Sequence, residues 1–92
     1  MAIRNFRHKG LEELFEKGRS GKIGRRFHKR LIQLMDILDA AIAIQDLVGV
    51  SDFHSLKGNR RGEHSMHVTG NWVITFKFKD GEVLDLGFED YH

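Results

Sequence analysis

Side chains able to perform acid–base chemistry on a phosphate gather in two short polar segments of this 92-residue sequence. The first, residues 53–62, is a basic stretch with a histidine, a lysine and two arginines; the second, residues 89–92, is Glu-Asp-Tyr-His. Cleaving RNA without a metal requires a base for the 2′-hydroxyl, an acid for the leaving 5′-oxygen and cations for the crowded phosphorane. Together the two segments contain side chains suited to all three tasks.

Each of these side chains fits one task. His54 and His92 suit the proton transfers because imidazole titrates near neutral pH. Lys57 can stabilise the phosphorane, and an arginine such as Arg60 can grip two phosphate oxygens at once. Tyr91 can stack on a base or donate its hydroxyl to a phosphate.

Other chemistries find less support. The chain has no cysteine, which excludes disulfides, thiol nucleophiles and cysteine-ligated metals. His64 and His67 lie three apart in a predicted strand, so they point to opposite faces and cannot easily share an ion. We therefore predict no metal and no cofactor, and a metal-dependent nuclease using the six histidines is the alternative. Glycine-rich nucleotide loops and a nucleophile turn for Ser-His-Asp hydrolysis are both absent from the sequence.

Charge is distributed unevenly along the chain although its net charge is only +2. Residues 1–31 and 53–79 are basic, whereas residues 32–52 and 80–92 are acidic. Two basic segments in a small protein favour a polyanion partner such as RNA, and a solvated helix face is the plain alternative.

Alternation with a period of two predicts an antiparallel meander in the C-terminal part. We expect strands over residues 64–69, 72–79 and 83–89, joined by a type II′ turn at Gly70-Asn71 and a type I′ turn at Asp80-Gly81. The alternation places these residues inward: Trp72, Ile74, Phe76, Phe78, Leu84, Leu86 and Phe88. The opposite face carries Val73, Thr75, Lys77 and Lys79.

The N-terminal half predicts helices. Residues 2–6 alternate weakly, as a short first strand would, and Gly10 opens a short amphipathic segment. A glycine-rich loop is expected over residues 18–23. The strongest helix signal follows and stops near Gly49; its apolar stripe comprises Phe27, Leu31, Leu34, Met35, Leu38, Ala41 and Ile42.

The sequence thus predicts one domain, residues 1–92, of the α+β class. Its N-terminal helices pack on one face of a mainly antiparallel sheet, because the long apolar stripe is the only large surface available to cover that face. No apolar stretch is long enough to span a bilayer and no secretory signal is apparent, so we expect a cytoplasmic protein without membrane contact.

Several motifs in one register resemble the HigB-type toxins of the RelE superfamily, which belong to bacterial type II toxin–antitoxin systems. These are Leu-Lys-Gly-Asn-Arg-Arg-Gly at 56–62, Ser-Met-His-Val at 65–68, Asn-Trp-Val-Ile-Thr-Phe at 71–76 and Glu-Asp-Tyr-His at 89–92. The terminal Asp-Tyr-His combined with Leu-Lys-Gly-x-Arg is the specific part of the resemblance. Weaker similarities lie at 3–6, 14–18 and 38–41. The resemblance implies the compact RelE-like microbial-ribonuclease fold, in agreement with the predicted elements.

The resemblance also implies an activity, partners and site residues. The activity is ribosome-dependent cleavage of mRNA in the A site, which inhibits translation. The partners are a HigA-type helix-turn-helix antitoxin, the ribosome, and operator DNA only through the antitoxin. The catalytic pattern falls on His54, Lys57, Asp90, Tyr91 and His92, and the predicted RNA contacts are Arg60, Arg61, Lys77 and Lys79.

One position departs from the family pattern. Relatives usually carry arginine after the tryptophan, where this chain has Val73. The departure removes a phosphate contact unless Arg60, Arg61 or Lys77 compensates. The alternative function is therefore a catalytically weak homologue that binds RNA or its antitoxin.

Overall fold

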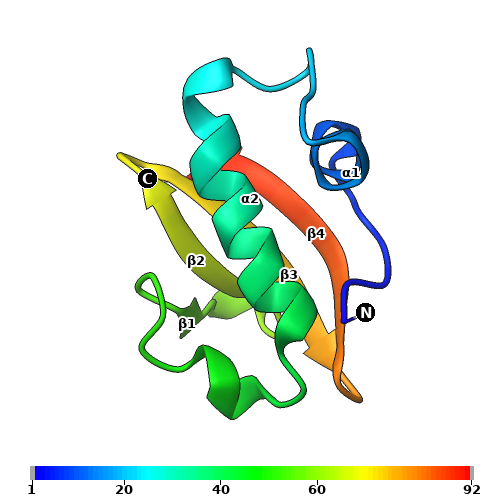
Figure 1. The fold of residues 1–92 in the computed structure, drawn as a ribbon. Helices are drawn as coiled ribbons and strands as arrows, with labels where there is room; N and C mark the ends of the chain where they lie inside the picture. Colours follow the sequence, from blue (N-terminus) through cyan, green and yellow to red (C-terminus); the bar gives the residue numbers. More distant parts are fainter. Residues whose placement is uncertain (1, 92) are drawn as a thin grey trace.

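The computed structural model describes residues 2–91 as two helices packed on one face of a four-stranded antiparallel sheet (Figure 1). This confirms the predicted fold class. The strands are consecutive neighbours in the order β1-β2-β3-β4. The elements are α1 (Lys9–Lys17), α2 (Arg25–Ala40), the 3₁₀ turn η1 (Ile44–Leu47), β1 (His54–Ser55), the 3₁₀ turn η2 (Gly58–Arg60), β2 (His64–Thr69), β3 (Trp72–Lys79) and β4 (Glu82–Asp90).

The meander follows the predicted boundaries closely. β2 and β3 have the expected ends, and β4 is one residue longer at each end than predicted. Asp80 and Gly81 both have positive φ, 53° and 77°, as the type I′ turn requires. Gly70 has a φ of 56°, which suits the first central residue of a type II′ turn.

A β-bulge at Asp85 changes which residues of β4 face the helices. Thr75 pairs with Gly87 and Lys77 with Leu84, so β4 carries one extra residue between these pairs. Asp85 has a left-handed φ of 54° at this point. As a result Val83 and Leu86 are both fully buried in the core. The prediction that Leu84 points inward is therefore wrong, because the bulge interrupts strict alternation.

Residues 2–6 do not form the predicted strand. They run beside β4 and make two isolated parallel bridges, Ile3 with Val83 and Phe6 with Leu86. The bulge prevents a continuous ladder between them. Instead the Asn5 side chain donates to the Asp85 carboxylate at 2.8 Å and accepts from the Asp85 backbone N–H at 3.0 Å.

α2 ends nine residues before the predicted stop at Gly49. The backbone becomes extended at Ala41, and Ile42 is 82% exposed rather than part of the apolar stripe. The cause is local: the Asp46 carboxylate accepts hydrogen bonds from the N–H groups of Ile42 and Ala43, which favours η1 over further helix. The predicted loop at 18–23 and the short helix before it are both present.

The core lies between α2 and the sheet (Figure 1). Leu31, Leu34 and Leu38 of the α2 stripe are completely buried. At the start of α2, the Phe27 ring packs against Trp72 and Phe88 at centroid distances of 5.2 and 5.1 Å. Within residues 2–91, neither helix has the length and apolar character needed to cross a bilayer.

Two neighbouring side chains of α2 test how far this face stabilises the fold. Leu38→Ala should lower the free energy of unfolding by about 2–5 kcal/mol, because the cavity it leaves is fully buried. Ile37 is 38% exposed, so Ile37→Ala should cost about 1 kcal/mol or less. Urea unfolding measures both, and equal losses would contradict the assigned helix face.

Candidate active site

A tight turn before β1 determines where His54 lies. Ser51 and Asp52 both have left-handed φ values, 46° and 54°, and the Phe53 N–H donates to the Val50 carbonyl at 2.9 Å. The turn is attached to β2 by a bond from the His67 N–H to the Ser51 carbonyl. Asparagine and aspartate tolerate such φ values best among non-glycine residues, so Asp52 suits its place.

Two hydrogen bonds orient the exposed imidazole of His54. Its Nδ1 lies 2.9 Å from the Asp52 carbonyl, which can only accept, so Nδ1 carries the proton. Its Nε2 lies 3.3 Å from the hydroxyl of Ser65, the residue paired with His54 across the strands. In the neutral ring Nε2 is consequently the basic nitrogen.

The loop after β1 exposes two cations. Leu56 is buried and its N–H donates to the Glu63 carbonyl at 2.9 Å, which closes the loop at its base. Gly58 and Gly62 both have positive φ, 70° and 98°, within the loop. Lys57 and Arg61 are exposed on it.

The end of β4 lies beside the β2–β3 turn. Asp90 pairs with Trp72 in the sheet, and the Tyr91 N–H donates to the Asn71 carbonyl at 2.8 Å. The Tyr91 side chain is 44% exposed. His92, predicted to take part in proton transfer, lies outside the described residues.

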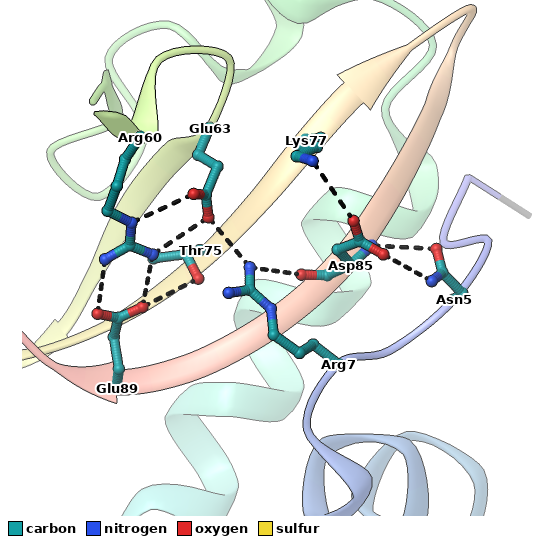
Figure 2. A network of polar contacts seen from close by, with 8 residues as sticks. All are labelled: Asn5, Arg7, Arg60, Glu63, Thr75, Lys77, Asp85 and Glu89. Carbon is teal, nitrogen blue, oxygen red and sulfur yellow. Dashed lines mark hydrogen bonds and ion pairs between the residues drawn. The ribbon is translucent and has the colours of Figure 1, made fainter. Parts of the chain in front are cut away.

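Arg60 joins the loop to β4 on the sheet face opposite α2 (Figure 2). Its guanidinium donates to both carboxylate oxygens of Glu89 at 2.8 Å. It also donates to both oxygens of Glu63, at 3.1 and 3.2 Å. Arg7 donates to Glu63 as well, at 3.0 Å. We call these four residues the ion cluster; two positive and two negative charges make it neutral.

The ion cluster shifts the titration of its own members. Hydrogen bonds from Arg60, and then from Arg7, lower the pKa of Glu63 to about 2. The bond from Arg60 likewise lowers the pKa of Glu89, and the two glutamates raise the pKa of Arg60. Arg60, Glu63 and Glu89 are therefore charged across the physiological pH range.

Two buried hydroxyls lie in the sheet beside the ion cluster. Ser65 and Thr75 face each other across β2 and β3 and are almost fully buried. The Thr75 hydroxyl lies 3.4 Å from Glu89, and the Ser65 hydroxyl lies near His54. A polar row therefore runs from His54 through both hydroxyls to Glu89.

Gly87 leaves room above β4 for the side chains of Arg7 and Thr75. A Cβ at Gly87 would lie 3.2 Å from the Thr75 hydroxyl and 3.5 Å from Nε of Arg7. The absence of a side chain thus leaves room for the guanidinium that contacts Glu63.

The predicted RNA-contacting residues fall into two groups. Arg60 and Arg61 belong to the loop next to Tyr91. Lys77 and Lys79 lie toward the other end of β3. Lys79 is about 23 Å along the strand from Trp72, at its start. Lys77 lies 3.8 Å from the Asp85 carboxylate (Figure 2).

Val73 lies on the same face as the ion cluster and is nearly buried. Its sheet neighbours are His67 and Glu89. The Glu89 carboxylate beside Val73 accepts two hydrogen bonds from Arg60. The guanidinium next to Glu89 therefore comes from Arg60 and not from position 73.

The remaining strand histidines do not share a site. His64 stacks on Phe53 at a centroid distance of 5.3 Å, and burial lowers its pKa. His67 points to the other face and contacts the Gly70 carbonyl at 3.0 Å. Among residues 2–91, no three His, Asp or Glu side chains gather in a way that could hold a metal ion.

Two hollows have linings that do not include His54, Lys57 or Tyr91. The larger, of about 590 Å³, forms where α1 ends and α2 begins, and the smaller, of about 320 Å³, lies beside Arg7. Most side chains around the larger hollow are basic: Lys17, Arg19, Arg25 and His28. Gly24 caps α2 without a side-chain hydrogen bond, and the first turn of α2 contains no acidic residue. The start of α2 therefore supplies no negative charge to offset the basic side chains around the larger hollow.

Comparison with known proteins now decides the family. A model of HigB-like toxins, described as RelE-like toxins of type II toxin–antitoxin systems, matches residues 4–92. The chain belongs to the HigB-like toxin family. This HigB-like toxin is also similar to Endoribonuclease HigB of Proteus vulgaris, with 40% identity over 91 residues that cover 98% of this chain and 99% of that protein. The resemblance drawn from the motifs is confirmed, and membership of a type II system implies an antitoxin as partner.

The sequence of this HigB-like toxin gave no signal for Glu63 and Glu89 as partners of Arg60. Glu89 lies 29 residues away, and no spacing rule connects an arginine in a loop with a glutamate near the end of a strand. The alternation of β3 did place Thr75 on the correct face, which is the one hint that a polar row exists there.

The lowered pKa of Glu63 predicts how acid weakens this toxin. A carboxylate with a depressed pKa stabilises the folded state above its ordinary pKa, and the stabilisation is lost as pH falls through the folded value. The free energy of unfolding of wild type should therefore exceed that of Glu63→Gln by about 1–3 kcal/mol above roughly pH 5. This difference should shrink as the pH falls toward about 2. Chemical denaturation at a series of pH values measures it.

Glu16→Gln removes the same charge from an exposed side chain of α1 and serves as the control. A Glu63→Gln difference that is independent of pH would contradict the assigned hydrogen bonds.

Proposed function

We propose that this endoribonuclease toxin cleaves mRNA in the ribosomal A site by metal-independent attack of the 2′-hydroxyl. Family membership and the similarity to an endoribonuclease support the enzyme class. The observation that carries the proposal is Arg60, which ties the loop that bears Lys57 to the strand that leads to Tyr91. A phosphodiester lying over the Arg60–Glu89 pair contacts side chains of both the Lys57 loop and the end of β4.

In the proposed reaction the 2′-oxygen attacks the neighbouring phosphorus. Its proton passes to a base, the bond to the 5′-oxygen breaks, and that oxygen takes a proton from an acid. The products are a 2′,3′-cyclic phosphate and a 5′-hydroxyl. Lys57 stabilises the charge on the phosphorane, and Tyr91 positions the nucleotide by stacking.

His54 is the candidate acid. Protonation of Nε2 completes an imidazolium whose Nδ1–H still donates to the Asp52 carbonyl. The bond to Ser65 is long, 3.3 Å, so the Nε2 proton can transfer to a leaving oxygen without breaking a strong contact. His92 and Asp90 manage or orient proton transfer at the 2′-hydroxyl in this scheme.

A large host presents the substrate. Neither of the two hollows is lined by His54, Lys57 or Tyr91, which favours a substrate held in place by a larger partner. The basic hollow at the start of α2 provides a surface for ribosomal RNA, with Lys77, Lys79 and Arg61 as further contacts.

The antitoxin partner is proposed to be a HigA-type helix-turn-helix protein, through which the toxin reaches operator DNA. All of these steps take place in the cytoplasm. The N-terminal half of the toxin is basic. An antitoxin that docks on this half should therefore present an acidic surface to it.

Removal of one cation tests the site. Lys57→Ala should reduce cleavage of a defined message on ribosomes by about 100-fold or more, because the phosphorane loses a charge partner. His92→Gln should also abolish most cleavage. Lys9→Ala removes an equally exposed lysine from the start of α1 and should leave cleavage unchanged. A translation extract measures all three, and unchanged cleavage in folded Lys57→Ala would remove the proposed site.

Val73 separates the proposal from a catalytically weak binding homologue. We expect wild type to stop growth on induction and Val73→Arg to be no more toxic, because the exposed Lys57 and Arg61 already supply cations for the phosphate. Val73→Met controls for the change in volume, and antitoxin binding reports folding. A harmless wild type with a toxic Val73→Arg variant would favour the binding homologue.

A further inference from the structure

We propose that Arg60 is a positioning residue that fixes the loop bearing Lys57 against Tyr91, and that it does not contact the RNA. The inference rests on the proposed function for its meaning in catalysis. It changes the role expected for Arg60 from the basic character of its loop.

The hydrogen bonds of Arg60 leave it little capacity for a phosphate. A guanidinium has five N–H donors. Four hydrogen bonds from its Nε, Nη1 and Nη2 already go to Glu63 and Glu89. A bidentate grip on phosphate requires two parallel donors, so it would first have to break one of these carboxylate pairs.

Both carboxylates are themselves held in place. Glu63 also accepts from Arg7, and its side chain is only 13% exposed. Glu89 also contacts the buried Thr75 hydroxyl. Withdrawing Arg60 would leave two partly desolvated negative charges with fewer partners, which is costly. The ion cluster therefore opposes release of Arg60 to a ligand.

The ion cluster joins the two halves of the proposed site. Arg60 lies three residues after Lys57, in a turn where its N–H donates to the Lys57 carbonyl at 3.4 Å. Tyr91 lies two residues after Glu89, and the guanidinium carbon lies 6.0 Å from the centre of its ring. The conformation of Arg60 thus determines where the loop lies relative to the tyrosine.

A lysine could not replace Arg60 in this role. Each carboxylate is met by a pair of guanidinium nitrogens, Nη1 and Nη2 for Glu89 and Nε and Nη2 for Glu63. An ammonium group is a point charge without that fork. This makes Arg60→Lys informative, because it keeps the positive charge that an RNA contact would need and loses the geometry that positioning needs.

The first experiment compares steady-state cleavage on programmed ribosomes. Arg60→Met and Arg60→Lys should each lower kcat by about 10- to 100-fold with KM changed by less than about twofold, since orientation is lost rather than affinity. Arg61→Met removes the neighbouring exposed cation, a proposed RNA contact, so it should raise KM and leave kcat unchanged within about twofold. Lys9→Met removes an exposed cation outside the proposed site and is the control, with both kcat and KM unchanged within about twofold.

Glu89→Gln distinguishes the two roles by the sign of its effect. If Arg60 contacted RNA, removing a negative charge and freeing the guanidinium would strengthen binding and raise kcat/KM. Positioning predicts that Glu89→Gln lowers kcat, and that Arg60→Met adds no further loss to it, because both changes break the same pair. A higher kcat/KM in Glu89→Gln, or a higher KM with normal kcat in Arg60→Met, would overturn the proposal.

The second measurement does not depend on cleavage. Backbone amide exchange of Leu56 and Tyr91, whose N–H groups bond to Glu63 and Asn71, should become several-fold faster in Arg60→Met and stay unchanged in Arg61→Met.

Unchanged exchange in Arg60→Met would reject positioning even if the variant is inactive. An inactive wild type with faster exchange in Arg60→Met would reject the proposed function alone. Thermal unfolding and antitoxin binding identify a variant that fails to fold, in which case Glu89→Gln decides.

Discussion

The neutral ion cluster on the open face of the sheet is the constraint on which the candidate site depends. A loop of six residues, 57–62, with two glycines would otherwise be free to move relative to β4. Two carboxylates from different segments meet one guanidinium there, and a second arginine from the N-terminal segment balances the charge. Segments far apart in the chain are thereby connected at one point. Such a partly buried cluster contributes to the arrangement of the site more than to net stability.

The two faces of the sheet have separate tasks. Toward α2, the rings of Phe27, Trp72 and Phe88 form a packed aromatic group at the start of the helix. On the other face, directly behind these rings, lie Val73 and Glu89, the residues that flank Trp72 and Phe88 in sequence. Rigid packing on the core side therefore supports the strand segment from which the candidate site is built.

The parts of the fold that follow from local patterns were predictable from sequence. β2 and β3 have the expected ends because the turn residues Gly70-Asn71 and Asp80-Gly81 bound β3 on both sides. The early end of α2 was not predictable, because it depends on the Asp46 carboxylate accepting from two N–H groups. The strand expected over residues 2–6 failed because of the bulge in β4, which no residue type in that segment signals.

For the site, residue types indicated the chemistry but not the contacts. A basic loop and a polar tail suggested RNA cleavage, and the structure joins loop and tail through Arg60. A loop arginine looks like an RNA ligand until its partners are known, and here those partners are 3 and 29 residues away in sequence. The role of His92 stays a prediction.

The bulge at Asp85 also determines which face of the sheet each later side chain of β4 points to. Side chains of a strand alternate, so one additional residue inverts the facing of everything that follows. With the inserted aspartate, Glu89 meets Arg60 on the open face while Phe88 enters the core. Without the bulge, Val83 and Phe88 would point to opposite faces of the strand, and only one of them could enter the core. A single left-handed residue near the middle of β4 thus allows both halves of the last strand to turn apolar side chains toward α2.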